Sequence, residues 1–219
     1  MPDDRHDILE AAFPSQSARF YLAMSIGGTP ELAEVPPNRY AADTMPATRL
    51  PATLHRAAPW KNGLGVSYTI ADFPPDAGFD AVAWQVGHTD IGVDCPFSNL
   101  PGLDRQFMVI EGAGVELSCT DENGTTSVHR VEPMRGPFAF RGDWLTTCRL
   151  LDGPVKVFNV MTRRGRHAAT VAVVSGLEGA RPAAAETVIA VELPTLDAWI
   201  LDGPPPRVER AVLVRMRRL

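Results

Sequence analysis

Short runs of apolar residues separated by turn residues constrain the fold of this chain more than any other feature. From Thr48 onward, runs rich in β-branched and aromatic side chains alternate with Gly, Pro, Asp and Asn. The apolar period of about 3.6 residues that marks an amphipathic helix is nearly absent. Short strands at this spacing are typical of an all-β sandwich or barrel. The expected strands are Thr48–Leu54, Val66–Ala71, Ala81–His88, Gln106–Ile110, Val115–Thr120, Thr125–Val131, Phe138–Phe140, Thr146–Leu151, Val155–Met161, Ala169–Val174, Thr187–Val191 and Ala211–Arg215.

Two further segments carry local signals. Glu122-Asn123-Gly124 lies between two expected strands and predicts a β-hairpin, because Asn-Gly readily adopts the positive φ angles of a tight turn. Leu196–Leu201 is compatible with a short helical turn or a brief strand, and the sequence leaves this choice open. A division near residue 120 would give two similar β units, which periodicity alone does not establish.

The first 45 residues differ from the rest of the chain. They are rich in Pro and Gly and hold one mildly apolar patch, Phe20–Met24. We expect residues 1–45 to be an N-terminal extension, either a poorly ordered leader with a short helix near Ile8–Phe13 or the product of a start site assigned too far upstream. The folded domain is expected over residues 46–219.

Composition narrows the class of protein. The 219 residues are 45% hydrophobic and 21% charged, which is ordinary for a soluble globular protein. The net charge of −5 argues against a nucleic-acid binder. No apolar window is long enough to cross a bilayer, and the charged N-terminus lacks the core of a signal peptide, so we expect a cytoplasmic protein. Cys95, Cys119 and Cys148 are odd in number and widely spaced, which fits neither a disulfide framework nor a zinc site.

Sequence motifs for metal binding and for common catalytic mechanisms are missing. The histidines lie far apart along the chain, and neither His-x-His nor His-Glu-x-x-His occurs. Gly-x-Ser-x-Gly is absent, and Gly63-Leu64-Gly65 lacks the third glycine of a phosphate loop. We therefore expect no intrinsic metal and no cofactor. Acid–base chemistry by paired carboxylates remains open, because such pairs need no fixed spacing.

Three polar clusters adjoin expected strands. The first, Trp60–Gly65, contains Asn62 and precedes a strand with Thr69; it forms either a tight turn or a ligand-facing loop. In the second, Arg105 follows Asp104 where a loop enters a strand, so Arg105 either pairs with Asp104 at the surface or anchors an anion. The third contains Asn159 inside an apolar strand, where an amide needs structural partners or a polar cavity.

Four separated blocks together resemble the HutD/Ves family over about residues 48–215. The blocks are Pro59-Trp60-Lys61-Asn62-Gly63-x-Gly65, Pro96-Phe97-Ser98-x-x-Pro101-Gly102-x-Asp104-Arg105, Glu111-Gly112-x-Gly114, and Leu151-Asp152-Gly153-Pro154-x-x-x-Phe158-Asn159-x-Met161-x-x-Arg164-Gly165. The resemblance implies a cupin-like (RmlC-type) β-barrel, with two cupin-like units packed in one chain (a bicupin). It also implies the absence of the usual cupin metal histidines.

For function, the resemblance implies binding of a small carboxylate metabolite, with urocanate or formylglutamate as favoured candidates. The matching ligand-binding positions would be Asn62, Thr69, Arg105 as the anion anchor, Asn159 and Arg164. His88 departs from the family pattern, because it lies near the cavity where small or acidic residues are expected, and it joins this set.

The leading hypothesis is a metal-free, cupin-type carboxylate binder that modulates histidine utilisation or acts under stress. One alternative is a metal-independent enzyme acting on such a metabolite, with His88 or a buried carboxylate as general base. The other is a structural or interaction protein whose cavity is vestigial. A homodimer formed through sheet edges is compatible with each hypothesis.

Overall fold

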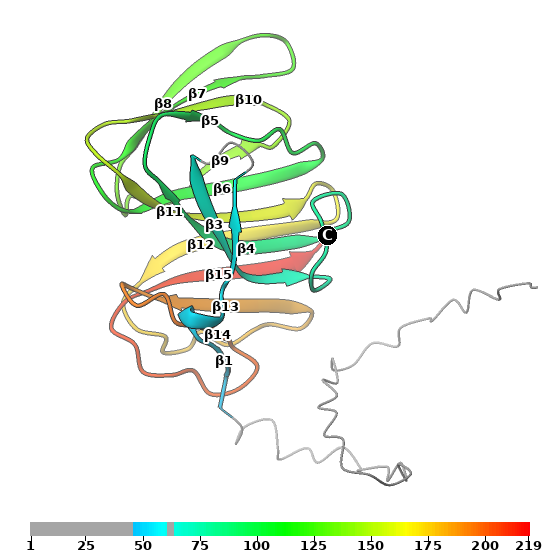
Figure 1. Ribbon diagram of the computed structural model, residues 1–219. Coiled ribbons are helices and arrows are strands. Elements are labelled where there is room, and N and C mark those ends of the chain that lie inside the picture. Colours follow the sequence, from blue (N-terminus) through cyan, green and yellow to red (C-terminus); the bar gives the residue numbers. More distant parts are fainter. Residues whose placement is uncertain (1–45, 61–63) are drawn as a thin grey trace, which may run out of the picture. The chain divides into compact units, whose positions relative to one another are not determined.

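The computed structural model describes residues 46–60 and 64–219 (Figure 1). The expected N-terminal extension over residues 1–45, its short helix and Asn62 lie outside the described residues. Within the described part, every sheet is antiparallel, and the one helical element is the short 3-10 helix η1 (Ala52–Leu54). The described residues include no helix that is both long enough and apolar enough to cross a membrane. The predicted all-β class is confirmed.

Three sheets form successive layers. The central sheet has six strands, in the order β2 (Arg56–Pro59), β3 (Gly65–Phe73), β4 (Trp84–Ile91), β11 (Val155–Arg163), β6 (Leu103–Glu111) and β9 (Phe138–Arg141). A four-stranded sheet contains β5 (Cys95–Pro96), β10 (Leu145–Leu150), β7 (Val115–Thr120) and β8 (Thr126–Val131). A five-stranded sheet contains β1 (Thr48–Leu50), β14 (Ala198–Ile200), β13 (Glu186–Glu192), β15 (Ala211–Arg218) and β12 (His167–Val174).

The central sheet buries both of its faces because its strands carry apolar residues at successive positions. On β11, Phe158 and Val160 belong to the core shared with the five-stranded sheet. Val155 and Val157, at alternate positions, belong to the core shared with the four-stranded sheet. All three cysteines are buried in this second core or against it as free thiols.

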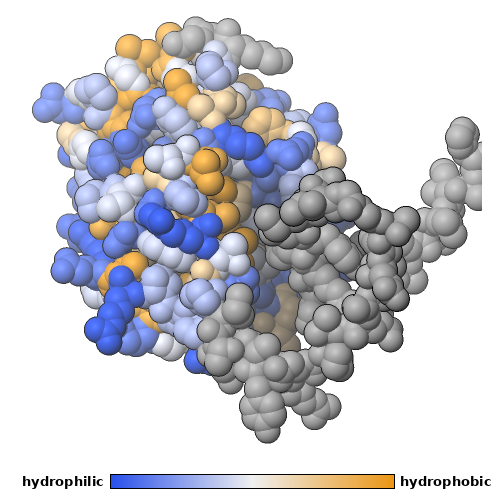
Figure 2. Space-filling view, turned by 60° about the horizontal axis from the view of Figure 1, so that its bottom comes forward, coloured by the Kyte–Doolittle hydropathy of each residue, from blue (hydrophilic) through white to orange (hydrophobic). Residues whose placement is uncertain are grey.

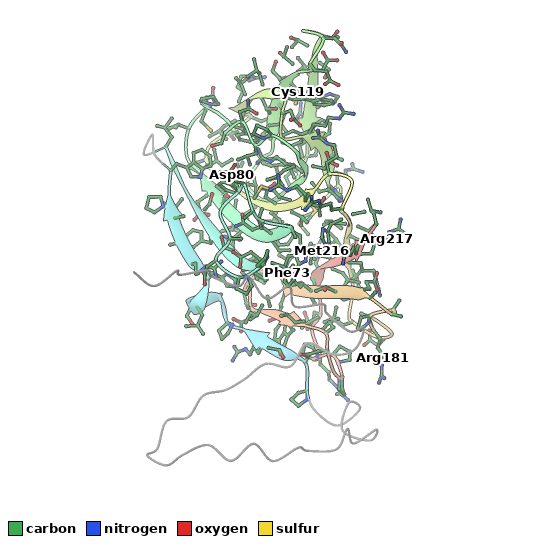
Figure 3. All side chains as sticks on the ribbon, turned by 90° about the vertical axis from the view of Figure 1, so that its right-hand side faces the viewer. Phe73, Asp80, Cys119, Arg181, Met216 and Arg217 are labelled. Atoms are coloured by element: carbon green, nitrogen blue, oxygen red, sulfur yellow. The ribbon has the colours of Figure 1, made fainter. Side chains whose placement is uncertain are left out.

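The five-stranded sheet is covered differently on its two faces. One face packs on the central sheet, and a small hollow of about 150 Å³ is lined by Phe73, Trp84 and Met216 where the two sheets meet. Figure 3 labels Phe73 and Met216 in this region. Leu177 and Ala180 pack with Leu201 in a separate apolar cluster over other residues of this sheet.

Figure 2 shows one face of the molecule, on which hydrophobic side chains lie among hydrophilic ones. The closed barrel and the two-unit organisation stay predictions.

Strand positions follow the sequence closely, with local differences. The strand expected over Thr48–Leu54 ends at Leu50 and η1 follows, because Pro51 has no N–H to donate to a sheet. Leu196–Leu201 contains the brief strand β14 rather than a helical turn. The sequence missed the short strands β2 and β5. The predicted hairpin joins β7 to β8, and Asp121 Oδ1 accepts hydrogen bonds from the backbone N–H groups of Asn123 and Thr125, each at 2.9 Å.

Candidate functional site

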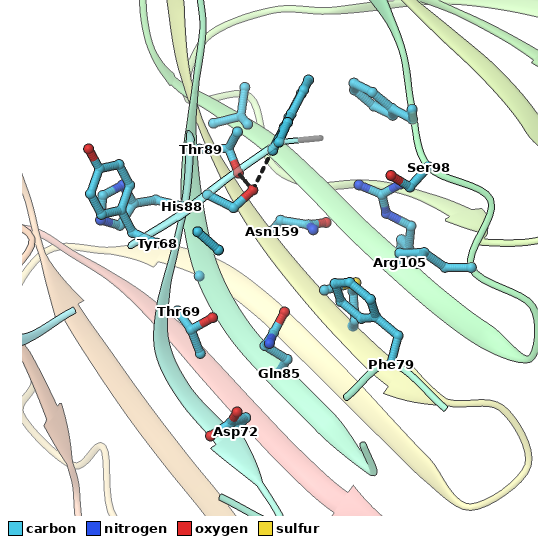
Figure 4. A pocket seen from close by; sticks show the side chains of 18 of the residues that line it. Tyr68, Thr69, Asp72, Phe79, Gln85, His88, Thr89, Ser98, Arg105 and Asn159 are labelled. Carbon is cyan, nitrogen blue, oxygen red and sulfur yellow. Dashed lines mark hydrogen bonds between the residues drawn. The ribbon is translucent and has the colours of Figure 1, made fainter. Parts of the chain in front are cut away.

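A pocket of about 770 Å³ lies on the face of the central sheet that looks toward the four-stranded sheet. Its floor consists of side chains from β3, β4, β11 and β6, and the segment after β5 closes one side with Phe97 and Ser98 (Figure 4). Arg163 holds the segment around Phe79, another part of the pocket lining, because its guanidinium donates to the carbonyl oxygens of Phe79 at 2.5 Å and Val82 at 3.1 Å. The pocket is therefore framed by segments remote in sequence.

Strand register aligns the polar side chains of the floor in rows. One row runs across five strands as Asp72, Gln85, Met161, Arg105 and Phe140. Residues directly opposite one another in an antiparallel sheet project from the same face. Asp72, Gln85, Met161 and Arg105 therefore share the pocket floor, and Phe140 belongs to the buried core beside it. The neighbouring row contains Thr69, Gly87, Asn159 and Phe107.

Arg105 is the dominant charged group of the pocket. Its residue is 8% exposed, and its Nε has no hydrogen-bond partner among the described residues. Its Cζ lies 5.0 Å from the ring centroid of Phe97 and 4.9 Å from that of Phe140. Burial lowers the pKa of Arg105 to about 10, which leaves the guanidinium charged at neutral pH. Arg105 is thus a buried cation that contacts aromatic rings and lacks a paired anion within the described chain.

Asn159 and Thr69 line the same pocket as Arg105. The Asn159 Oδ1 is buried and has no hydrogen-bond partner in the described part of the molecule. Gly87, between these two residues in the row, has no room for a side chain, because a Cβ there would lie 2.5 Å from the carbonyl oxygen of Tyr68. The missing side chain allows β3 and β4 to approach each other closely at this point. The structure therefore brings three predicted residues, Thr69, Arg105 and Asn159, to the floor of one cavity, and the predicted His88 also lines that cavity.

An ion-pair group lies at the other end of the first row. Arg56 donates to Asp72 Oδ2 at 2.5 Å and lies 2.9 Å from Asp76 Oδ1. The Asp72 side chain is only 4% exposed, whereas that of Arg56 is 48% exposed. This group, which the sequence did not reveal, gives the pocket an acidic end with two carboxylates and one guanidinium.

His88 contacts the pocket differently from the other candidates. Strand alternation places its imidazole on the face opposite Thr89, beside Tyr68, whose ring stacks on it at a centroid distance of 4.6 Å (Figure 4). His88 Nε2 lies 3.2 Å from Nδ1 of His55. Burial lowers the pKa of both histidines, that of His88 to about 4, and the neighbouring His55 adds to this effect. Two histidines far apart in sequence thus meet in the fold, although residues 46–60 and 64–219 contain no group of three or more His, Cys, Asp or Glu that could hold a metal.

Arg164 lies outside the pocket. Its Nε donates to Asp104 Oδ1 at 2.7 Å, and its Nη2 donates to Asp143 Oδ2 at 2.5 Å and to the carbonyl oxygen of Leu103 at 3.0 Å. These hydrogen bonds join the start of β6 to the loop after β9, so the Arg164 guanidinium has a structural role there. Asp104 pairs with Arg164, so the alternative of a surface pair between Asp104 and Arg105 is wrong.

The sequence did not single out the pocket residues Gln85 and Asp72, nor Phe140, whose ring contacts Arg105. Alternation along each strand identifies which residues share a face. It does not say which strands become neighbours, and only the strand order places Phe140 beside Arg105 and Asp72 beside Gln85.

Comparison with known proteins gives relatives for most of the described chain. A family model described as HutD matches residues 52–196. Protein Ves from Escherichia fergusonii is 32% identical over 105 residues, which is 48% of this chain and 51% of that protein, so the chain spans about half the length of this curated relative.

Solved structures share the fold. HutD from Pseudomonas fluorescens SBW25, solved in a formate condition, aligns with a TM-score of 0.64 and 26% identity over 78% of this chain and 98% of that one. A conserved protein of unknown function from Pseudomonas aeruginosa PAO1 gives 0.61 and 23% identity over 78% and 97% of the two chains. A mutant oxalate decarboxylase from Bacillus subtilis gives 0.50 at 7% identity over 85% and 84%, a likeness of fold alone that confirms a cupin-type architecture. Because the family match covers well over half of its residues, the chain belongs to the HutD/Ves family.

Proposed function

We propose that this chain is a metal-free, cupin-type protein that binds a small carboxylate metabolite in the pocket around Arg105. The observation that carries the proposal is the buried guanidinium, which has no anionic partner among the described residues. An unpaired buried charge costs several kcal/mol, and a fold tolerates this cost readily where the missing partner is a ligand.

The chemistry of the site favours a carboxylate over a phosphate. A guanidinium offers parallel N–H donors that match the two oxygens of a carboxylate. Arg105 is a single buried cation, and the opposite end of the pocket carries Asp72 and Asp76, which would repel a more highly charged anion. Ser98 and Asn159 line the pocket and offer neutral hydrogen-bonding groups for other ligand atoms.

Family membership and the sequence support a proposal for the cellular role. We propose a cytoplasmic modulator of histidine utilisation or a stress-associated protein, built as a barrel of two cupin-like units. The HutD relative was solved in a formate condition, which makes formate the simplest first probe of the site. Homodimerisation remains a prediction.

A thermal-shift screen followed by calorimetric titration tests the proposal. The probes are formate, acetate, urocanate and formylglutamate, each with and without a chelator. A ligand that binds only the folded state raises the melting temperature with concentration. We expect a chelator-insensitive rise that is lost in Arg105→Gln and retained in Arg149→Gln, whose guanidinium pairs with Glu116 outside the pocket. No rise with any probe, or a rise unchanged in Arg105→Gln, would overturn the proposal.

The enzyme alternative with His88 as general base gains no support from the geometry. His88 is one of the residues that line the pocket, but strand alternation directs its imidazole to the face opposite Asn159 and Arg105. There it stacks on Tyr68 and lies edge-on to His55. A base must reach the proton it abstracts within hydrogen-bond distance, directly or through one water molecule. The binding proposal therefore takes precedence.

A further inference from the structure

We infer that the ligand of this pocket is a zwitterion, with a carboxylate at Arg105 and a cationic amine at the Asp72–Asp76 end. This inference rests on the proposed function and adds the chemistry of the second end of the ligand. It starts from the row of side chains that joins the two ends across the floor, Asp72, Gln85, Met161 and Arg105.

The row sets the span of the ligand. Asp72 and Arg105 are three strand steps apart, and neighbouring strands lie about 4.8 Å apart, so their Cα atoms are separated by roughly 14 Å along the sheet. The long Arg105 side chain occupies part of this separation. What remains suits a ligand with several carbon atoms between its two polar ends. A pocket of about 770 Å³ is likewise far larger than a formate ion requires.

The charges at the two ends have opposite sign. Arg105 is a buried cation without a partner among the described residues. At the other end, Asp72 and Asp76 share one guanidinium, that of Arg56, so the group carries a net charge of −1 at neutral pH. Between the ends, Gln85 and Thr69 present neutral polar groups. A ligand ammonium placed at the acidic end is attracted, whereas a second carboxylate there is repelled.

The ion pair at the acidic end differs from a surface ion pair because the Asp72 carboxylate is buried. The Asp72 side chain is 4% exposed, while its partner Arg56 is 48% exposed. The buried carboxylate lies on the pocket floor, and the arginine reaches it from the solvent side. Charges in such partly buried positions are screened less by salt than exposed ones.

Calorimetric titration with matched ligands tests the inference. The set is 6-aminohexanoate, hexanoate and adipate, which share a carboxylate and a six-carbon chain and differ only at the far end. The shorter set of 4-aminobutyrate, butyrate and succinate makes the same comparison with a four-carbon chain. We expect the amino acid of one set to bind about tenfold more tightly than its two partners at low salt. The measured quantity is the ratio of the affinity of the amino acid to that of each partner in its set. All three ligands share the Arg105 contact, so its contribution cancels in this ratio.

Variants at the acidic end change this ratio in opposite directions. Asp72→Asn and Asp76→Asn are each expected to bring the ratio toward one, and Asp76 provides a variant with little effect on folding because its side chain is 78% exposed. Arg56→Gln leaves two uncompensated carboxylates and is expected to raise the ratio. Glu116→Gln, at an ion pair on the four-stranded sheet, makes the same charge change outside the pocket and should leave the ratio unchanged.

The two proposals fail in distinguishable ways. If the monocarboxylate and the amino acid bind equally well and both depend on Arg105, the carboxylate proposal stands and the zwitterion inference is wrong. Tighter binding of the dicarboxylate also overturns the inference and assigns Arg56 as a second anion anchor. Binding of none of the six probes overturns the inference, and the thermal-shift screen with formate, acetate, urocanate and formylglutamate then decides the carboxylate proposal by itself.

Discussion

Arg105 and Phe140 lie directly opposite each other on β6 and β9, and the Arg105 Cζ is 4.9 Å from the centroid of the Phe140 ring. The ring centroid of Phe97 lies 5.0 Å from the same Cζ atom. Desolvated cation–π contacts contribute about 2 kcal/mol, which offsets part of the cost of burying the charge. The rings do not replace an anion, because they accept no strong hydrogen bond from the guanidinium. The contact therefore holds Arg105 in place and leaves its donors available to a ligand.

Arg105→Met is expected to separate stability from binding. Methionine keeps most of the apolar volume and removes a buried charge, so the free energy of unfolding should stay the same or rise by about 1 kcal/mol. Binding of formate or of larger carboxylates should be lost. Urea denaturation and calorimetry measure the two effects. A loss of stability above about 2 kcal/mol would show instead that Arg105 supports the fold.

Arg164→Gln is expected to lower the stability of the fold and to leave ligand binding unchanged, the reverse of Arg105→Met. The substitution removes the contacts to Asp104 and Asp143 that join the start of β6 to the loop after β9. Because these groups are partly exposed, the expected loss of stability is only about 1 kcal/mol. Carboxylate affinity should be unchanged at temperatures well below unfolding. Weaker carboxylate binding by the fully folded variant would show that Arg164 contributes to ligand binding after all.

The buried histidine pair predicts a loss of stability in mild acid. Burial lowers the pKa of both His55 and His88, that of His88 to about 4, from an ordinary value of about 6.5. Between these values the unfolded chain binds more protons than the folded one, so the free energy of unfolding falls as the pH drops from about 6.5 toward about 4. Above this window the pair contributes no pH dependence. We expect a loss of about 2 kcal/mol across it.

Urea denaturation at several pH values checks this expectation. His88→Gln removes one imidazole of the pair and should flatten the profile between pH 6.5 and 4. His129→Gln, at a histidine of β8 that contacts Ser127, provides the control and should retain the slope. Equal slopes in all three proteins would mean that other groups cause the acid sensitivity.

Gly87→Ala tests the packing beneath the pocket. The new Cβ would lie 2.5 Å from the backbone carbonyl oxygen of Tyr68, which cannot move without shifting β3. We expect a loss of about 1–3 kcal/mol in the free energy of unfolding, together with weaker carboxylate binding. Gly92→Ala is the matched control, since a Cβ at Gly92 meets no atom within 4 Å. Similar stability of the two variants would contradict the close approach of β3 and β4 at this point.

The sequence alone determined the all-β class, most strand positions and the β7–β8 hairpin. These features depend on side-chain alternation and turn chemistry, which are local. It also singled out Arg105 and Asn159, because a charged or amide side chain within or beside an apolar strand needs a specific partner. Thr69 was predicted from the family resemblance. The four blocks of family resemblance added the cupin-type fold.

Only the tertiary structure decided which of these residues meet. The order of strands in the central sheet places Asp72 and Arg105 in one row, and it turns Arg164 toward Asp104 and Asp143. It also brings His55 against His88 on the face opposite Arg105, although the two histidines are 33 positions apart. Alternation fixes which side chains of one strand share a face, but neighbours on other strands depend on long-range pairing. That pairing depends on burial across the whole sheet, so no local pattern in the sequence specifies it.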